Sequence, residues 1–275
     1  MPDRHPGVHS RRIRPAADGD RLPIAGGRFY PKNATALRAL VTLLLDAVDG
    51  TAGLAPAYVV PHGAIAASGP TAAHVYARLR QHASLIERVV LLGPVHDRHA
   101  EVTGSVVPQA ATWSTPLGSA AIDTDAVAML VNDGHAHADD ALHRDEHALE
   151  IQLPFLQVAV PSAGIVPMLI GPTTVEDVIV TLAALTHPGE GTVIIATTDL
   201  GEPRTASRAL LSILEMAAER ITPRDACGVY ALRGLIGWAN HRQLRAELLA
   251  REGDNIACSF DEVAVPRQGG AAARR

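Results

Sequence analysis

Two histidines stand just past two short apolar segments of this 275-residue chain. Residues 57–60 and 89–92 are apolar runs rich in valine that predict buried strands, and His62 and His96 follow them closely. If both strands belong to one open α/β sheet, the two imidazoles reach the same edge, where such sheets bind ligands. Because neutral imidazole is a common ligand of zinc, iron and copper, this pattern favours a metal site. The alternative is that each histidine closes a loop by bonding a backbone carbonyl.

Residues 145–155 form the densest polar cluster of the chain. The acids at positions 145 and 146 suit the positive end of a helix dipole, so they predict a helix start. On that helix Glu146 and Glu150 share one face. His147 is then a candidate for proton transfer, with Glu146 or Glu150 as the carboxylate that orients it. The alternative is an ordinary helix N-terminus with a solvated acidic face.

Asp199 and Cys227 are two further candidates. Asp199 follows the apolar run 192–196, where it could bind metal, orient a histidine, act as a base or simply cap a turn. Cys227 precedes an apolar helical stretch, and a thiolate there would be a soft ligand for iron, copper or zinc. A lone cysteine is, however, more often a small buried hydrophobe. Cys258 lacks any such context and is expected to be inert.

The elements that must position these side chains alternate between helical and strand patterns. The strands are expected at 57–60, 89–92, 102–107, 165–170 and 192–196. The helices are expected at 33–48 with Asn33 as cap, 70–80 opening near Pro70, 124–131, from 145, 174–185 behind a capping box, 205–221 and 229–251. Strands separated by helices predict a single three-layer α/β domain with a mostly parallel central sheet flanked by helices.

Composition narrows the class of protein. The net charge of -5 gives no electrostatic reason to expect nucleic acid or an anionic membrane as partner. Two cysteines cannot form a disulfide framework, and neither a secretory signal nor a run long enough to span a membrane is evident, so we expect a cytoplasmic protein. Residues 1–20 and 268–275 are predicted to be disordered tails, which leaves a domain at 21–267.

Taken in order, these segments resemble the Memo family, the B component of the AmmeMemoRadiSam system. The motifs that carry the resemblance are Gly26-Gly27-Arg28-Phe29-Tyr30-Pro31, Pro61-His62, Leu92-Gly93-Pro94-Val95-His96, Thr115-Pro116-Leu117-Gly118, the segment from Asp145 to Phe155, Val166-Pro167-Met168-Leu169-Ile170-Gly171, Thr198-Asp199 and Cys227-Gly228. The order and spacing cover roughly residues 22 to 240. The Asp-Glu-His segment is specific, whereas Thr-Pro-Leu-Gly alone is not.

The resemblance implies a fold similar to that of class III extradiol dioxygenases and a metal centre at the carboxyl edge of the sheet. It implies one iron or copper ion held by His62, His96 and Cys227. A zinc ion with a bound water, which would support hydrolysis, is a variant within the enzyme class. Glu146, His147 and Asp199 would line the same cleft as catalytic groups. The resemblance also implies a peptide or small-molecule ligand in that cleft and a functional link to a radical SAM protein and an AMMECR-type protein.

The chain departs from the family pattern beside these residues. The second histidine usual after His96 is replaced by Asp97, and the histidine usual three residues after Asp199 is replaced by Glu202. Two hypotheses follow. The first is a metal-dependent oxidoreductase, dioxygenase-like, in which His147 moves protons. The second is a catalytically degenerate binding module that recognises a peptide or small molecule in the same cleft.

Overall fold

A computed structural model describes residues 19–97, 101–187 and 189–263. The predicted tails therefore lie almost entirely outside the described residues, although Asp20 already pairs with Thr112 in a short strand. Within the described part of the chain, no helix is long and apolar enough to cross a membrane.

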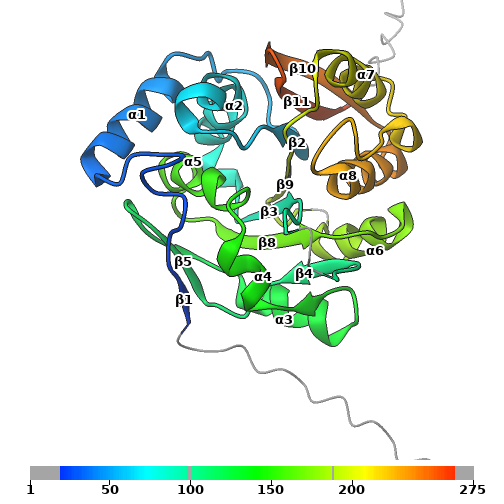
Figure 1. Cartoon of the computed structure of the whole chain (residues 1–275), viewed down its shortest axis with the longest axis horizontal. Coiled ribbons are helices and arrows are strands. Elements are labelled where there is room, and N and C mark those ends of the chain that lie inside the picture. The colour runs from blue at the N-terminus through cyan, green and yellow to red at the C-terminus, as the bar shows by residue number, and fades with distance from the viewer. Residues whose placement is uncertain (1–18, 98–100, 188, 264–275) are drawn as a thin grey trace, which may run out of the picture.

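The centre of the molecule is an eight-stranded sheet (Figure 1). Its strands, in spatial order, are β10 (Leu244–Glu252), β11 (Asn255–Glu262), β2 (Ala57–Val60), β9 (Thr192–Thr197), β3 (Arg88–Gly93), β8 (Gly164–Ile170), β4 (Ser105–Val107) and β7 (His137–Ala138). The four central strands β2, β9, β3 and β8 are parallel to one another, which confirms the mostly parallel sheet. Because β2 and β3 both pair with β9, their carboxyl ends meet at one edge.

Helices cover both faces of this sheet (Figure 1), which confirms the single three-layer α/β domain. One layer consists of α1 (Ala34–Asp46), α2 (Ile65–Gln81) and α5 (Leu153–Ala159), which contact one another. The other is built on α8 (Val229–His241) and α6 (Val175–Leu185); α3 (Thr124–Asn132) contacts α6, and α7 (Pro203–Leu214) contacts β10. A small second sheet joins β1 (Asp20–Arg21), β5 (Thr112–Thr115) and β6 (Gly118–Ala121).

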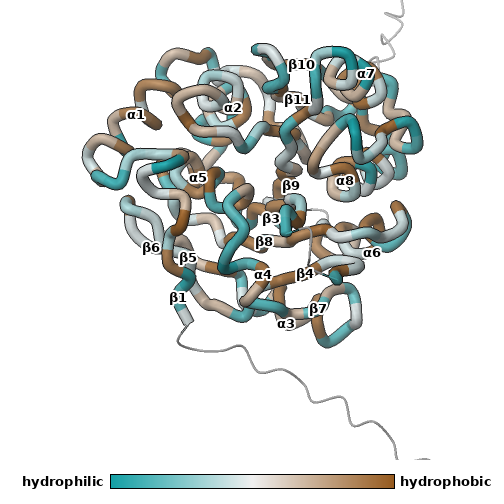
Figure 2. The backbone as a smooth tube through the Cα atoms, viewed as in Figure 1, coloured by the Kyte–Doolittle hydropathy of each residue, from teal (hydrophilic) through white to brown (hydrophobic). Residues whose placement is uncertain are grey.

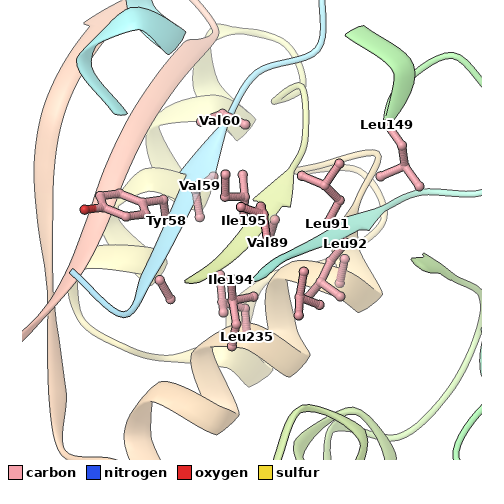
Figure 3. Packing of buried hydrophobic residues seen from close by; sticks show 14 of the residues in the cluster. Tyr58, Val59, Val60, Val89, Leu91, Leu92, Leu149, Ile194, Ile195 and Leu235 are labelled. Atoms are coloured by element: carbon pink, nitrogen blue, oxygen red, sulfur yellow. The ribbon is translucent and has the colours of Figure 1, made fainter. Parts of the chain in front are cut away.

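The core lies between these layers and explains why the central strands have no polar face. Figure 2 shows apolar residues concentrated along the central strands, and Figure 3 shows their side chains packed at close range. Val59, Leu91 and Ile195, from three adjacent strands, are completely buried. A parallel sheet covered on both faces requires such continuous apolar strands, so the polar residues that follow them are confined to the sheet edge.

Two helix starts follow the predicted capping chemistry and one does not. Asn33 accepts the Ala36 N–H at the start of α1, and Thr174 and Asp177 form a complete capping box before α6. The expected start at Pro70 is wrong, because α2 begins five residues earlier at Ile65 and contains Pro70. Proline removes one internal hydrogen bond from a helix. The burial of α2 against the sheet and α1 outweighs that loss.

The helix predicted to begin at 145 is also wrong, and this error matters for the site. A short helix, α4 (Asp140–Asp145), ends there, and Glu146 has an extended backbone with φ -92° and ψ 126°. The chain then turns before a 3₁₀ segment, η2 (Glu150–Gln152), and α5. The Glu146 carboxylate accepts the Ala148 N–H, and such local side-chain bonds compete with a helix.

The last predicted helix, 229–251, ends early and is followed by a hairpin. α8 stops at His241, and residues 244–252 form β10 instead. Gly253, at φ 62°, allows the turn into β11, which pairs with both β10 and β2. Leu, Ala, Glu and Arg in this stretch favour a helix locally, but pairing along the sheet overrides that preference. Similarly, α7 ends at Leu214 rather than continuing to 221.

Candidate metal centre

Three potential metal ligands come together at the carboxyl edge of the central sheet. His62 follows β2, His96 follows β3, and Cys227 lies in the loop before α8. One donor atom of each residue lies within 4.8 Å of the other two donors. The His62 Nε2 atom is 3.3 Å from the Cys227 Sγ atom, and the two imidazole centroids are 5.2 Å apart. His62 is buried, whereas His96 and Cys227 are exposed, so the cluster is open to solvent on one side.

In each of the two imidazoles, the Nδ1 atom is hydrogen-bonded to a neighbouring side chain. The Nδ1 atom of His62 lies 3.0 Å from the Thr197 hydroxyl, and the Nδ1 atom of His96 lies 2.9 Å from the Glu146 carboxylate. Because Nδ1 is occupied in both rings, Nε2 is the atom left to bind a metal. Metal-binding histidines in proteins almost always have such a partner, which fixes the tautomer and the ring orientation.

Cys227 carries a thiol with an increased tendency to ionise. Burial of the sulfur opposes ionisation, but the imidazoles of His62 and His96 and the Asp199 N–H, which donates to Sγ over 3.2 Å, lower the thiol pKa to about 6. The loop is held in place because the Cys227 N–H donates to the Asp199 carbonyl. Since thiolate is the form that binds metals, this sulfur is prepared for coordination near neutral pH.

The lowered pKa of Cys227 predicts a distinctive pH dependence of alkylation in the metal-free protein. The thiolate fraction rises with pH through about 6. The iodoacetamide rate at Cys227 should therefore level off near pH 7, where an ordinary cysteine, with a pKa of about 8.5, is still mostly protonated. The rate is measured by mass spectrometry of the Cys227 peptide. A midpoint above pH 8 would contradict the thiolate assignment.

Glu146 supports His96 rather than forming a second metal site. Its carboxylate accepts the His96 N–H at 2.9 Å, the Ala148 N–H at 2.8 Å and the His96 Nδ1–H. Burial raises the pKa of this carboxyl, but its hydrogen bonds and the nearby imidazole lower it to about 2. The hydrogen bonds that His96 forms with Cys227 and Glu146 raise the pKa of His96 in turn. Glu146 and His147 lie close enough to His96 to form a second ligand group, but the oxygens of Glu146 already serve these donors.

His147 faces the cluster from the side of the N-terminal segment. Its ring stacks on His96 with centroids 4.9 Å apart and on Phe29 with centroids 4.5 Å apart. Burial lowers the pKa of His147 even though Glu146, 3.4 Å from its Nδ1 atom, favours the charged form. The lowered pKa favours the neutral form of this imidazole, the form that can act as a proton acceptor.

Asp199 follows β9, between the two histidine-bearing strands. Its Oδ1 atom accepts the backbone N–H of His62 at 2.8 Å, and its Oδ2 atom is 3.8 Å from the His62 Nε2 atom. The side chain is partly exposed. The structure thus brings all six of the predicted site residues (His62, His96, Cys227, Glu146, His147 and Asp199) to one edge of the sheet.

A buried polar chain behind His62 is absent from the sequence predictions. Thr197 receives a hydrogen bond from the Gln152 side-chain amide, and the Gln152 carbonyl accepts one from the Tyr76 hydroxyl. All three of these side chains are buried. Thr197 is the polar last residue of β9, directly after the apolar run 193–196. A buried polar residue needs a hydrogen-bond partner, and this signal could have identified Thr197 as the partner of His62.

The helical prediction allowed Glu150 to orient His147, but in the structure it does not. Because residues 146–149 are not helical, Glu150 points to the N-terminal segment and forms a buried ion pair with Arg21, at 2.6 Å. Its oxygens also accept the N–H of Ala25 and the hydroxyl of Tyr30. Of the two carboxylates proposed for His147, only Glu146 lies beside that imidazole.

Comparison with known proteins identifies the family of this chain. Residues 21–233 match the family model described as Memo-like protein. A MEMO1 family protein of Methanopyrus kandleri is 32% identical over 226 residues, covering 76% of this chain and 78% of that protein. A MEMO1 family protein of Pyrococcus horikoshii is 34% identical over 194 residues, covering 65% and 64%. An uncharacterized Escherichia coli K12 protein of known structure overlaps with a TM-score of 0.46 at 13% identity, over 74% of this chain and 99% of that one. The family match spans every residue of the cluster, and this chain therefore belongs to the Memo family.

Proposed function

We propose that this protein binds one redox-active metal ion, iron or copper, through His62 Nε2, His96 Nε2 and Cys227 Sγ. The observation that carries the proposal is the convergence of these three donors within 4.8 Å, with the second nitrogen of each imidazole already bonded. Two imidazoles and a thiolate suit iron, copper and zinc better than magnesium or calcium, which prefer oxygen ligands.

The spacing of the donors fits a bound transition metal. Metal–nitrogen and metal–sulfur bonds of about 2.1 and 2.3 Å place the two ligand atoms roughly 3.6 Å apart at a tetrahedral angle. The distance between His62 Nε2 and Cys227 Sγ, 3.3 Å, is close to that value. The donor atom of His96 lies within 4.8 Å of both.

The surrounding residues support redox or oxygen-dependent chemistry as the activity. A bound iron or copper ion supplies the capacity for one-electron transfer and oxygen chemistry. Burial lowers the pKa of His147, which favours its neutral form, and its ring stacks on His96, which supports a role as proton acceptor. Asp199 holds the His62 backbone with one oxygen and leaves the other near the cluster. The exposed side of His96 and Cys227 is where a small molecule or peptide would bind.

Metal analysis of protein purified without added metal tests this proposal. We expect close to one iron or copper per chain in the wild type, the same in a Cys258→Ser control, and a large loss in Cys227→Ser. Cys258 is a matched control because it is the other free cysteine and lies buried in β11, which carries no donor of the cluster. A full metal complement in Cys227→Ser would contradict the ligand assignment. Metal-loaded protein that consumes no oxygen across a panel of reductants and catechols would favour the binding module.

A further inference from the structure

Arg21 binds the segment that carries two of the site residues. Its guanidinium lies over the Trp113 ring, 4.5 Å from the centroid, and is buried. The Nε atom donates to the His143 carbonyl at 2.7 Å, and Nη2 donates to the Glu146 carbonyl at 2.7 Å. The last contact is to the backbone of the residue whose carboxylate holds His96.

Glu150 binds the N-terminal segment beside the contacts of Arg21. It pairs with the Nη1 atom of Arg21 and accepts the Ala25 N–H at 2.8 Å and the Tyr30 hydroxyl at 2.5 Å. These two partners flank Phe29, whose ring stacks on His147. The ion pair of Arg21 and Glu150 thus joins residues 21–30 to residues 143–150. Among the described residues, it is the only ion pair between these two segments.

From these contacts we infer that Arg21 is a positioning residue of the metal centre, which sets the Glu146 carboxylate against His96. The inference rests on the proposed function for its effect on metal affinity. Arginine suits the task because its planar fork can donate to several acceptors in fixed directions. Here one guanidinium holds a carboxylate and three backbone carbonyls, those of His143, Arg144 and Glu146, where α4 ends.

The substitution Arg21→Lys separates positioning from folding. Lysine keeps the charge beside buried Glu150, so the variant should fold, but its single ammonium cannot reach all the acceptors of the guanidinium. Glu146 then loses its fixed position. Changes in partners that hold metal ligands typically cost 10–100-fold in affinity, so we expect the Co²⁺ dissociation constant to rise on the order of 10-fold.

The test is a double-mutant cycle between Arg21→Lys and Glu146→Gln, with Co²⁺ binding followed by the absorption of the cobalt–thiolate. If Arg21 acts through Glu146, Arg21→Lys should change the dissociation constant less than about 2-fold in the Glu146→Gln background. Arg88→Lys is the control, because Arg88 also forms ion pairs, with Asp123 and Glu190, but at the opposite end of β3.

A second readout needs no metal. The backbone N–H groups of His96 and Ala148 donate to the Glu146 carboxylate, so their amide resonances and exchange rates report its position. Arg21→Lys should shift both resonances, and Arg88→Lys should shift neither. Unmoved resonances, or an equal loss of Co²⁺ affinity in both backgrounds, would overturn the inference. If the wild type fails to bind Co²⁺, the proposed function fails, and the amide resonances alone decide the positioning role.

Discussion

A His62→Ala, His96→Ala double variant is expected to bind iron, copper or Co²⁺ at least on the order of 1000-fold more weakly than the wild type. The two imidazoles are two of the three donors in the cluster, so their removal leaves only the Cys227 sulfur of the proposed ligand set. The measurement is a competition titration against a chelator of known affinity, with metal content determined on the same samples.

The matched control for this variant removes two histidines elsewhere. His82 contacts the Ala52 carbonyl, and His187 lies at the opposite edge of the sheet, near the start of β9. A His82→Ala, His187→Ala variant should keep the full affinity. If the His62, His96 variant retained stoichiometric metal, the ion would have to lie elsewhere, and the assignment of this edge of the sheet would be wrong.

The second large effect concerns stability. Glu150→Ala should lower the free energy of unfolding by about 3–5 kcal/mol, because it leaves the buried Arg21 guanidinium without its counter-charge. Loss of the bonds from Ala25 and Tyr30 adds to this cost. The change is measured by urea unfolding of the metal-free protein, so that metal binding does not contribute.

An exposed ion pair provides the comparison. Asp46 pairs with Arg80 at 2.7 Å, and the Asp46 side chain is 60% exposed. Asp46→Ala should therefore cost only about 0–1 kcal/mol. A Glu150→Ala cost as small as that of Asp46→Ala would show that the N-terminal segment is not held by this pair.

The sheet edge could be predicted because apolar residues give way there abruptly to strand-ending and polar residues. The apolar runs before His62, His96 and Asp199 are too short and too β-branched for helices, and each ends in Pro, Gly or Thr. Parallel strands place their carboxyl ends together, so the convergence of these side chains follows from the strand assignment alone. Cys227 required the family resemblance, because its position before an apolar helix is only weak evidence for a ligand over a small buried hydrophobe.

The environment of these side chains could not be predicted in the same way. The segment after Asp145 reads as a helix start, but Glu146 bonds backbone groups of His96 and Ala148 instead, and Glu150 pairs with Arg21, 129 residues away along the chain. Such partners depend on tertiary packing. The β10–β11 hairpin was missed for a related reason, since its strand pairing outweighs a local preference for helix.

The most direct test of the central claim is X-ray absorption spectroscopy at the edge of the metal that the purified protein carries. The proposed centre predicts one sulfur scatterer at about 2.3 Å and two imidazole nitrogens at about 2.0–2.1 Å from the ion, and loss of the sulfur in Cys227→Ser. A spectrum with only oxygen and nitrogen neighbours in the wild type, unchanged in Cys227→Ser, would contradict a metal held by His62, His96 and Cys227.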